Sequence, residues 1–492
     1  MAAGARQVEV AILGAGFSGL AVARELERTG LCNYAILERG GSVGGTWRDN
    51  SYPGCACDVP SHLYSLSFGP RPDWSRAYAP QPEIRAYLEA CADALGVRPH
   101  IELGREAVSA AWDEAGWWRV RLRSGEELLA RAVVAATGAL SNPAWAELPG
   151  RERFRGAQFH SAGWDHGFDL AGRRVAVVGT GASAIQFIPR IQPLAARLYV
   201  LQRTPPWILP RRDRAFRPWE RALLRGVRPA RWLYRQAVFW RLEGRALAFV
   251  EHPALMRLVA WAARRHLARA VRDPALRERL TPRYRPGCKR ILLADDYYPA
   301  ITRPNVELVT APIEGVLEGG LRLAGGRLLE VDAIIHGTGF AVHRHLGGLS
   351  VTGRGGVTLS ERWRGGAEAY LGTMVAGFPN LFLMTGPNTG LGHNSMLVMI
   401  EGQARWIARA LRLARRRGAA TVEPREEAER EWAERIRRRT ARSVWASGCR
   451  SWYLDPQGRN TTLWPGFASG FRARLARLRP AELRLGPAGR AA

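Results

Sequence analysis

The chain has 492 residues, of which 47% are hydrophobic, and this length and composition fit about three folded domains and exclude a mainly disordered protein. Its formal net charge is +28, a value that on its own would suggest nucleic acid or an anionic membrane as a partner. Lys289 is the only lysine, and the arginines are spread along the chain without a recognised nucleic-acid-binding module. We therefore interpret the charge as a composition bias and expect no nucleic acid partner.

The sequence shows no sign of secretion, of membrane insertion or of a metal site. A strand pattern begins at Val8, and the most apolar stretch of the middle region, residues 246–263, is broken by Glu251, His252 and Arg257. The cysteines form neither a Cys-x-x-Cys pair nor a metal-ligand spacing, and they stand at positions 32, 55, 57, 91, 288 and 449. We expect a cytoplasmic protein in a reducing setting.

The first predicted element is a buried strand over residues 8–13. It runs into the turn Gly14-Ala15-Gly16-Phe17-Ser18-Gly19 and a helical segment over 20–26. Such glycines let the backbone approach a pyrophosphate, whose charge meets the free N–H groups at the start of the helix. The next strand, over 34–37, ends at Glu38, where a carboxylate can accept both hydroxyls of an adenosine ribose. We therefore expect an FAD site here.

The same pattern of strand, turn and helix recurs over residues 174–188, around Gly179-Thr180-Gly181-Ala182-Ser183-Ala184. The second strand of this copy, over 198–201, leads to Arg203, which has the same offset from its first glycine as Glu38 has in the first copy. A carboxylate would repel a 2'-phosphate, whereas a guanidinium forms charge-assisted bonds to it worth about 1.5–3 kcal/mol each. The second site is therefore predicted to bind NADPH.

Three further strands end in glycine turns, over 132–138, 331–339 and 380–386, and a helix over 395–413 follows the last of them. The first two ends fit crossovers between two nucleotide-binding domains, and the last would return the chain to the FAD domain. We predict an α/β fold with two Rossmann-like dinucleotide-binding domains, of which the FAD domain is discontinuous. The predicted parts are 1–150 (FAD-binding domain, first part), 151–210 (linker and NADPH-binding domain), 211–285 (helical insertion in the NADPH domain), 286–340 (NADPH-binding domain, second part) and 341–492 (FAD-binding domain, second part, and C-terminal region).

The predicted insertion over 211–285 carries tryptophans and other apolar residues at partly helical spacings among many arginines. We interpret it as a packing face whose arginines extend to solvent, and we keep a substrate entrance and a membrane-surface contact as alternatives. Residues 424–440 place acids first and bases last, as the helix dipole favours, and this predicts an ordinary surface helix.

With both cofactors in one chain, the electrons need an acceptor beyond the flavin. A disulfide reductase would use two cysteines separated by two residues, but only one residue lies between Cys55 and Cys57. We therefore expect molecular oxygen as the acceptor.

Three segments resemble the Baeyer-Villiger monooxygenase family. Phe154, Gly156, His160 and Trp164 match its fingerprint F-x-G-x-x-x-H-x-x-x-W-[PD], just before the second glycine turn. Residues 44–58 are similar to its longer signature G-G-x-W-x(4)-[FY]-P-G-x(3)-D, and residues 287–290 resemble the segment that carries its active-site arginine. The resemblance implies that NADPH reduces FAD, that oxygen then gives a C4a-peroxyflavin stabilised by Arg290, and that a ketone becomes an ester or lactone.

The resemblance also implies roles for individual residues. Arg290 and Asp58 would be catalytic, with Asp58 orienting Arg290, and the fingerprint residues Phe154, Gly156, His160 and Trp164 would couple the domains. FAD would be held by Gly14, Gly16, Ser18, Gly19, Glu38, Gly45, Thr46, Trp47, Asp58, Tyr64, Val108 and Met396. NADPH would be held by Gly179, Thr180, Gly181, Ala182, Ser183, Gln186, Arg203, Thr204, Lys289, Arg290 and Trp452.

Two alternatives remain open at this point. One is a flavin-containing monooxygenase that oxidises nitrogen or sulfur, against which Trp164 and Arg290 argue. The other is a basic flavoprotein that binds nucleic acid. The sequence leaves open which ketone is used, although a bulky apolar one is expected, and it leaves open the regiochemistry, the pathway and the oligomeric state.

Overall fold

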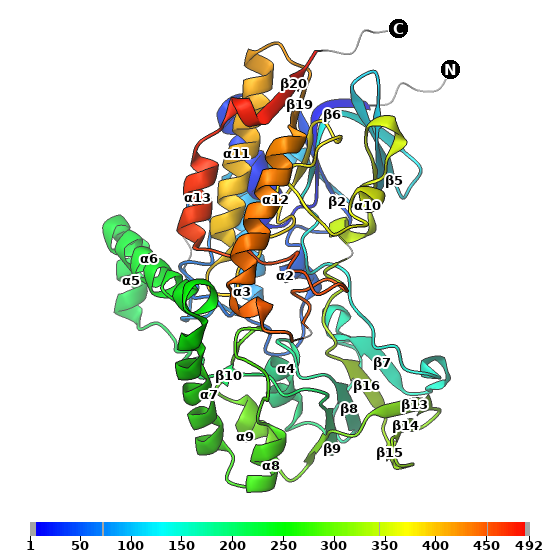
Figure 1. Cartoon of the computed structure of the whole chain (residues 1–492). Coiled ribbons are helices and arrows are strands. Elements are labelled where there is room, and N and C mark those ends of the chain that lie inside the picture. The colour runs from blue at the N-terminus through cyan, green and yellow to red at the C-terminus, as the bar shows by residue number, and fades with distance from the viewer. Residues whose placement is uncertain (1–5, 71–72, 344, 450, 488–492) are drawn as a thin grey trace.

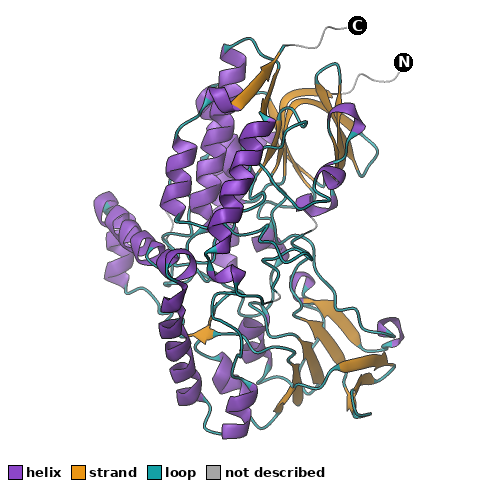
Figure 2. Ribbon diagram, viewed as in Figure 1, coloured by secondary structure: helices purple, strands orange, loops and turns teal. Residues whose placement is uncertain are grey.

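The computed structural model describes residues 6–70, 73–343, 345–449 and 451–487. Its strands form two main sheets in separate halves of the molecule, and helices α5 to α7 lie along one side of both halves (Figure 1). Figure 2 shows that most helices gather on that side and most strands on the other. This is the mixed α/β architecture that the two strand, turn and helix patterns predicted.

The first sheet is built around β1 (Arg6–Leu13), which pairs in parallel with β2 (Tyr34–Glu38) and with β6 (Glu127–Ala135). Its order is β17-β4-β5-β6-β1-β2-β3, and β18 also pairs with β6, so a late segment of the chain rejoins the first sheet. Because β1 is apolar from residue 10 onward, both of its faces are buried. The other strands are β3 (Ile101–Leu103), β4 (Ala107–Asp113), β5 (Trp117–Leu122), β17 (Ser350–Thr352) and β18 (Leu381–Leu383).

Helices α1 (Phe17–Thr29) and α11 (Met396–Arg416) pack against each other in this half of the molecule. Ser395 caps α11 by accepting a hydrogen bond from the backbone N–H of Leu397. The stacked rings of Trp432 and Trp464 help to fix α12 to the domain. The remaining elements here are α2 (Thr46–Asp49), α3 (Gln81–Ala94), α10 (Leu359–Arg362), α12 (Glu426–Ala441), α13 (Ala468–Ala476), β19 (Thr421–Pro424) and β20 (Leu483–Gly486).

The second sheet is wholly parallel, in the order β12-β9-β8-β16-β7. An antiparallel sheet of β13, β14 and β15 lies in the same half of the molecule. The strands of the parallel sheet are β7 (Ala157–His160), β8 (Arg174–Val178), β9 (Arg197–Leu201), β12 (Val306–Val309) and β16 (Ala333–His336). The other elements are α4 (Ala184–Ile191), α9 (Tyr297–Ile301), β10 (Ile208–Leu209), β11 (Leu292–Leu293), β13 (Ile313–Leu317), β14 (Gly320–Leu323) and β15 (Leu328–Glu330).

The helical segment between β10 and β11 is divided into several separate helices. No single described helix is long and apolar enough to cross a membrane; only the segments 228–251 and 253–270 taken together reach that length and composition, and they are bent by 110°. The helices are α5 (Pro218–Gly226), α6 (Arg228–Glu243), a π-helix (Leu247–Glu251), α7 (Met256–Ala270) and α8 (Pro274–Arg279).

Two crossovers join the halves, and they pair with each other. The backbone N–H of Ala144 donates to the carbonyl of Gly339 at 2.9 Å, and the N–H of Ala341 donates to the carbonyl of Asn142 at 2.9 Å. This pairing fixes the distance between the two sheets, and it lies next to the cavity described below, since Ala144 and Gly339 both line it.

Candidate active site

A cavity of about 1530 Å³ lies between the two halves. Ligand pockets usually measure about 300–1,000 Å³, so this one has room for more than one large ligand. Residues of both glycine turns line it, and the carboxyl ends of β1, β2, β8 and β9 lead to it. The strand topology therefore brings both predicted nucleotide sites to one shared space.

In the first turn, Gly14, Gly16 and Ser18 line the cavity, but Gly19 does not. A Cβ atom at Gly19 would come within 1.9 Å of the Gly14 carbonyl oxygen, so this position must be glycine for α1 to pack closely on β1. Glu38 is 3% exposed and lines the cavity beside the turn. Its carboxylate accepts hydrogen bonds from the backbone N–H groups of Ala15 and Gly40, each at 2.8 Å, which fixes it at the edge of the turn.

The other predicted flavin contacts fall into two groups. Gly45, Thr46, Trp47, Tyr64 and Met396 line the cavity. The Trp47 indole donates a hydrogen bond to the Tyr64 hydroxyl at 3.1 Å, which holds the two rings in one orientation. Val108 does not line the cavity, although its neighbour Ala107 does. The pairing of β4 with β5 shifts register at Val108, and such a bulge leaves backbone groups rather than the side chain available to a ligand.

In the second turn, all five residues from Gly179 to Ser183 line the cavity. Gly179 has φ +105°, and a Cβ atom there would come within 2.6 Å of the Gly337 carbonyl oxygen, so only glycine allows this approach of the two strand ends. Gln186 also lines the cavity, but its amide is used within the protein. It accepts from the Tyr52 hydroxyl at 3.0 Å and donates to the Ala56 carbonyl at 3.0 Å, so it joins α4 to the first domain.

Beyond this turn, Arg203, Thr204 and Lys289 line both the main cavity and a smaller opening next to it. Burial and the neighbouring Arg203 guanidinium lower the pKa of Lys289. Glu278, which lines the same opening, is paired with Arg283 at 2.8 Å, and no acidic side chain among the described residues forms an ion pair with Arg203 or Lys289. Two adjacent cations without a carboxylate partner make a site for an anion.

Arg290 and Asp58 meet in the cavity from positions 232 residues apart. Arg290 donates to the same Asp58 oxygen through Nε at 2.9 Å and through Nη2 at 2.5 Å. The two side chains are 29% and 31% exposed, and both line the cavity. Burial disfavours the charged form of Asp58, but Arg290 and Arg211 outweigh it and hold the pKa of this carboxyl below its ordinary value. The pair is therefore ionised, and the guanidinium stays charged at the cavity wall.

Two aromatic side chains of the C-terminal segment complete this region. Trp452 lines the cavity and is 39% exposed, and its ring centre lies 4.4 Å from that of Tyr453. Tyr453 is 1% exposed; burial raises its pKa to about 12, and the neighbouring Arg290 guanidinium opposes that shift. Sequence reasoning missed Tyr453, although its position next to Trp452 was an available signal.

The comparisons with known proteins decide the family. Residues 7–343 match the family model described as "Flavin-binding monooxygenase-like". A Baeyer-Villiger monooxygenase of Streptomyces coelicolor is 50% identical over 479 residues, which cover 96% of this chain and 92% of that protein. This chain belongs to the Baeyer-Villiger monooxygenases. It is thus a flavin monooxygenase enzyme, as the three sequence segments indicated.

Solved structures agree with this family. A steroid monooxygenase bound to NADP has a TM-score of 0.88 and 33% identity, and the match covers 98% of this chain and 99% of that one. The OTEMO complex with FAD and NADP has a TM-score of 0.88 and 28% identity, and the match covers 97% of this chain and 99% of that one. The two-domain α/β fold predicted from the sequence is therefore the fold of this Baeyer-Villiger monooxygenase.

The Baeyer-Villiger fingerprint lies behind the cavity rather than in its lining. His160, at the end of β7, accepts a hydrogen bond through Nδ1 from the N–H of Ala162 at 3.0 Å. Its ring centre lies 5.7 Å from that of Trp145 and 5.8 Å from that of Phe340, one on each crossover, and both of these line the cavity. Burial lowers the pKa of His160, so its ring is neutral near neutral pH.

The other fingerprint residues hold this strand in place. A Cβ atom at Gly156 would come within 2.4 Å of the Asp332 carbonyl oxygen, so the close approach of this segment to β16 requires glycine. Phe154 is buried in the core of the second domain. The Trp164 ring lies 5.2 Å from that of Phe187 in α4, behind the second glycine turn.

The cysteines divide into a bonded pair and free thiols. Cys288 and Cys449 form a disulfide, which the spacing did not indicate and which does not fit the reducing setting expected from the sequence. It ties the segment of Lys289 and Arg290 to the segment that leads to Trp452. Cys55 and Cys57 are free, and burial raises the pKa of Cys55 to about 12, so a reactive thiolate is disfavoured there. This agrees with the rejection of a disulfide reductase.

Proposed function

We propose that this NADPH-dependent flavin monooxygenase inserts one oxygen atom next to the carbonyl of a ketone and so forms an ester or a lactone. The observation that carries the proposal is the ionised pair of Arg290 and Asp58, which faces the cavity that both glycine turns line. FAD and NADPH are the cofactors of this family, and the residues present fit both.

The fit to FAD rests on the first turn and its surroundings. A Cβ atom at Gly45 would lie 3.4 Å from the Gly16 Cα, so two glycine backbones approach each other and leave space that side chains would fill. In the proposal, Gly14, Gly16 and Ser18 bind the pyrophosphate and Glu38 binds the ribose. The adenine end lies against the bulged strand at Ala107 and Val108, of which Ala107 lines the cavity. The flavin ring of FAD would be held by Gly45, Thr46, Trp47, Asp58, Tyr64 and Met396, and Gly19 would support the glycine turn.

The fit to NADPH rests on the second turn and on the cation pair. The backbone of Gly179, Thr180, Gly181, Ala182 and Ser183 would bind the pyrophosphate at the start of α4. Arg203, Thr204 and Lys289 would bind the 2'-phosphate, because two cations without an acidic partner favour a doubly charged ligand. Gln186 would act by holding α4 to the first domain, and Trp452 would cover the nicotinamide.

When bound and reduced, the flavin supplies the electrons that activate molecular oxygen. Arg290 then holds a permanent positive charge beside the oxygen that is transferred, because its guanidinium cannot lose its proton at ordinary pH. Asp58 fixes the direction of that guanidinium through two hydrogen bonds. A fixed charge aimed at developing negative charge in an enclosed site is an effective way to lower a reaction barrier. His160 contributes by holding both crossovers, which sets the angle between the domains.

The test uses the purified holoenzyme with NADPH, a panel of ketones and isotopically labelled oxygen gas. The expected product is an ester or lactone that carries one labelled oxygen atom, formed in step with NADPH consumption. Amines and thioethers serve as a second panel. Oxygenation of these compounds with every ketone left unchanged would replace the proposal by nitrogen or sulfur oxidation.

A further inference from the structure

The helical insertion exposes an unusual share of the molecule's large apolar side chains. Ten of the seventeen exposed large apolar residues in the described chain lie between positions 219 and 261. Figure 1 shows α5 and α6 projecting from the body of the molecule. A patch of this kind on a folded protein marks an interaction site. Its members are Trp219, Leu223, Val227, Trp232, Leu233, Trp240, Leu247, Leu255, Leu258 and Trp261.

Helix α6 has a buried apolar side and an exposed apolar side. Its inner side carries Val238 and Phe239, each 4% exposed, which pack into the main core. Its outer side carries Leu233 and Trp240, which are each 60% exposed, and Trp232, which lies in the first turns of the projecting helix, is 59% exposed. A surface helix normally places polar residues on the side away from the core, so an apolar outer side requires an apolar partner.

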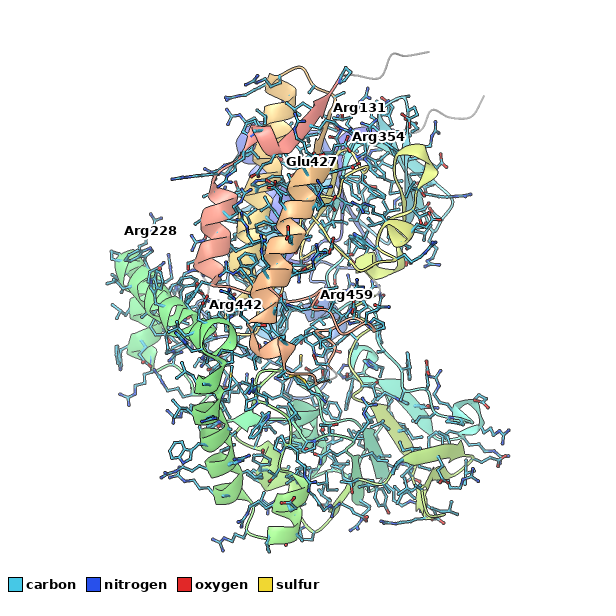
Figure 3. All side chains as sticks on the ribbon, viewed as in Figure 1. Arg131, Arg228, Arg354, Glu427, Arg442 and Arg459 are labelled. Atoms are coloured by element: carbon cyan, nitrogen blue, oxygen red, sulfur yellow. A yellow bond between two sulfur atoms is a disulfide. The ribbon has the colours of Figure 1, made fainter. Side chains whose placement is uncertain are left out.

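The same segment is strongly basic. Between positions 217 and 272 the sequence has 13 arginines and three acidic residues. The guanidinium of Arg265 lies 5.3 Å from the centre of the exposed Trp261 ring, so charge and aromatic surface are interleaved. Figure 3 shows Arg228 at the outer end of α6. Within the described chain no ion pair is formed by the exposed Arg228, Arg241, Arg257, Arg264, Arg265 or Arg269.

We propose that α5, α6, the π-helix and α7 form a docking surface for an anionic lipid bilayer. Tryptophan and leucine enter the boundary between headgroups and acyl chains, while arginine binds anionic headgroups, and this surface presents both together. The helices lie on the bilayer and do not cross it, because Phe239 in α6 and Leu267 in α7 are buried in the protein core. A second copy of the chain would bring two basic surfaces together, and a nucleic acid would leave the leucines without a partner.

The position of this surface has a functional consequence that rests on the proposed function. On its inner side, the insertion packs Phe249, Val250 and Met256 against Trp445 and Tyr453, next to the cavity wall. A docked enzyme would therefore hold its cavity near a phase in which apolar ketones concentrate. The docking itself does not depend on this and is tested without any ketone.

The experiment measures flotation of the FAD-loaded enzyme with vesicles of phosphatidylcholine alone and of phosphatidylcholine with phosphatidylglycerol. We expect binding to the anionic vesicles at ~0.1 M salt and its loss as salt screens the charges. Leu233→Gln/Leu258→Gln should lower the partition coefficient onto the vesicles at least about tenfold, because the two leucines that would be transferred from water to lipid are replaced by polar side chains. Arg257→Gln/Arg264→Gln should weaken binding to a similar degree and only on anionic vesicles.

Matched controls separate this surface from general charge or hydrophobicity. Leu194→Gln/Leu328→Gln removes two leucines of similar exposure, 51% and 58%, outside the insertion. Arg412→Gln/Arg416→Gln removes the same charge from the exposed side of α11. Both controls should bind vesicles like the unaltered protein, and all variants should keep the flavin absorbance.

Four results would overturn the proposal. These are absence of flotation with anionic vesicles, equal loss of binding in the control variants, a dimer in lipid-free solution that the Leu233 and Leu258 changes dissociate, and binding of a labelled DNA duplex at ~0.1 M salt in place of vesicles. The last two would assign the surface to a second copy or to nucleic acid.

Discussion

The pair of Arg203 and Lys289 offers the sharpest test of the cofactor assignment. If it binds the 2'-phosphate, replacing either cation by glutamine removes charge-assisted bonds that NADPH makes and NADH cannot. Such bonds contribute about 1.5–3 kcal/mol each, and 1.4 kcal/mol is a factor of ten, so the expected loss of preference is roughly 10- to 150-fold per residue. Arg203 is exposed and therefore screened, whereas Lys289 is partly buried, so we expect the larger loss for Lys289→Gln.

The pH dependence of NADPH binding gives a second, independent test of this cation pair. Burial and Arg203 lower the pKa of Lys289, because they disfavour its charged form. The 2'-phosphate favours the charged form, so binding of NADPH takes up a proton whenever Lys289 is neutral in the free enzyme. The KM for NADPH should therefore rise as the pH rises through the lowered pKa. NADH, which lacks the phosphate, should not show this rise, and neither should NADPH with Lys289→Gln.

The assay is kcat/KM for NADPH and for NADH at saturating ketone and oxygen, with Arg283→Gln as the matched control. Arg283 lines the same opening, but it is paired with Glu278 at 2.8 Å, so its removal should change the preference little. A preference left unchanged by both Arg203→Gln and Lys289→Gln would mean that the phosphate binds elsewhere. Arg203→Glu, which adds a repulsive charge, should cut the preference at least about tenfold.

Three further predictions follow from other contacts. Arg290→Ala should lower ester formation on the order of 100-fold or more, and Asp58→Asn by a smaller factor, while NADPH oxidation continues with release of peroxide; normal ester yields per NADPH would remove the pair from the mechanism. Cys288→Ser/Cys449→Ser should lower the calorimetric unfolding temperature by several degrees, because a cross-link across 161 residues contributes on the order of 5 kcal/mol in the chain-entropy model. An unchanged unfolding temperature would contradict this expectation. Burial lowers the pKa of His336 from 6.5 to about 4, so unfolding takes up a proton between these pH values. The unfolding temperature should therefore fall as the pH drops from 6.5 to 4. His336→Asn should make this fall less steep, and an unaltered slope would refute the assignment.

The local elements could be predicted because their signals are short in sequence. Gly19 must be glycine because of a contact within its own strand, turn and helix unit, the approach to the Gly14 carbonyl oxygen, so the local pattern predicts this structure. The same holds for Ser395, which caps α11 with its own side chain. Gly179, by contrast, must be glycine because it approaches the Gly337 carbonyl oxygen, which belongs to a distant part of the chain. Glu38 ends the second strand of its unit and Arg203 follows the second strand of the other, and their charges alone distinguish the two expected cofactors.

Other features could not be derived from local patterns, because they join segments that no spacing relates; the pairing of Arg290 with Asp58 was implied by the family resemblance alone. Arg290 meets Asp58 across 232 residues, and the bond between Cys288 and Cys449 spans 161. Only the packing of the two domains and of the C-terminal segment brings these atoms within reach. Tyr453 is a further case: it stands next to Trp452 in the sequence, but its burial beside Arg290 depends on the packing of the C-terminal segment.

The sequence by itself determined two nucleotide-binding units, the opposite charges at the ends of their second strands, and the family through three short segments. The tertiary structure decided which side chains reach the shared cavity, and it gave Gly19 a packing contact and the Gln186 amide hydrogen bonds to the other domain. It also decided which side of α6 stays exposed. The physical reason is that hydrogen bonds and turns within a unit depend on near neighbours, whereas burial depends on every segment that packs against a residue.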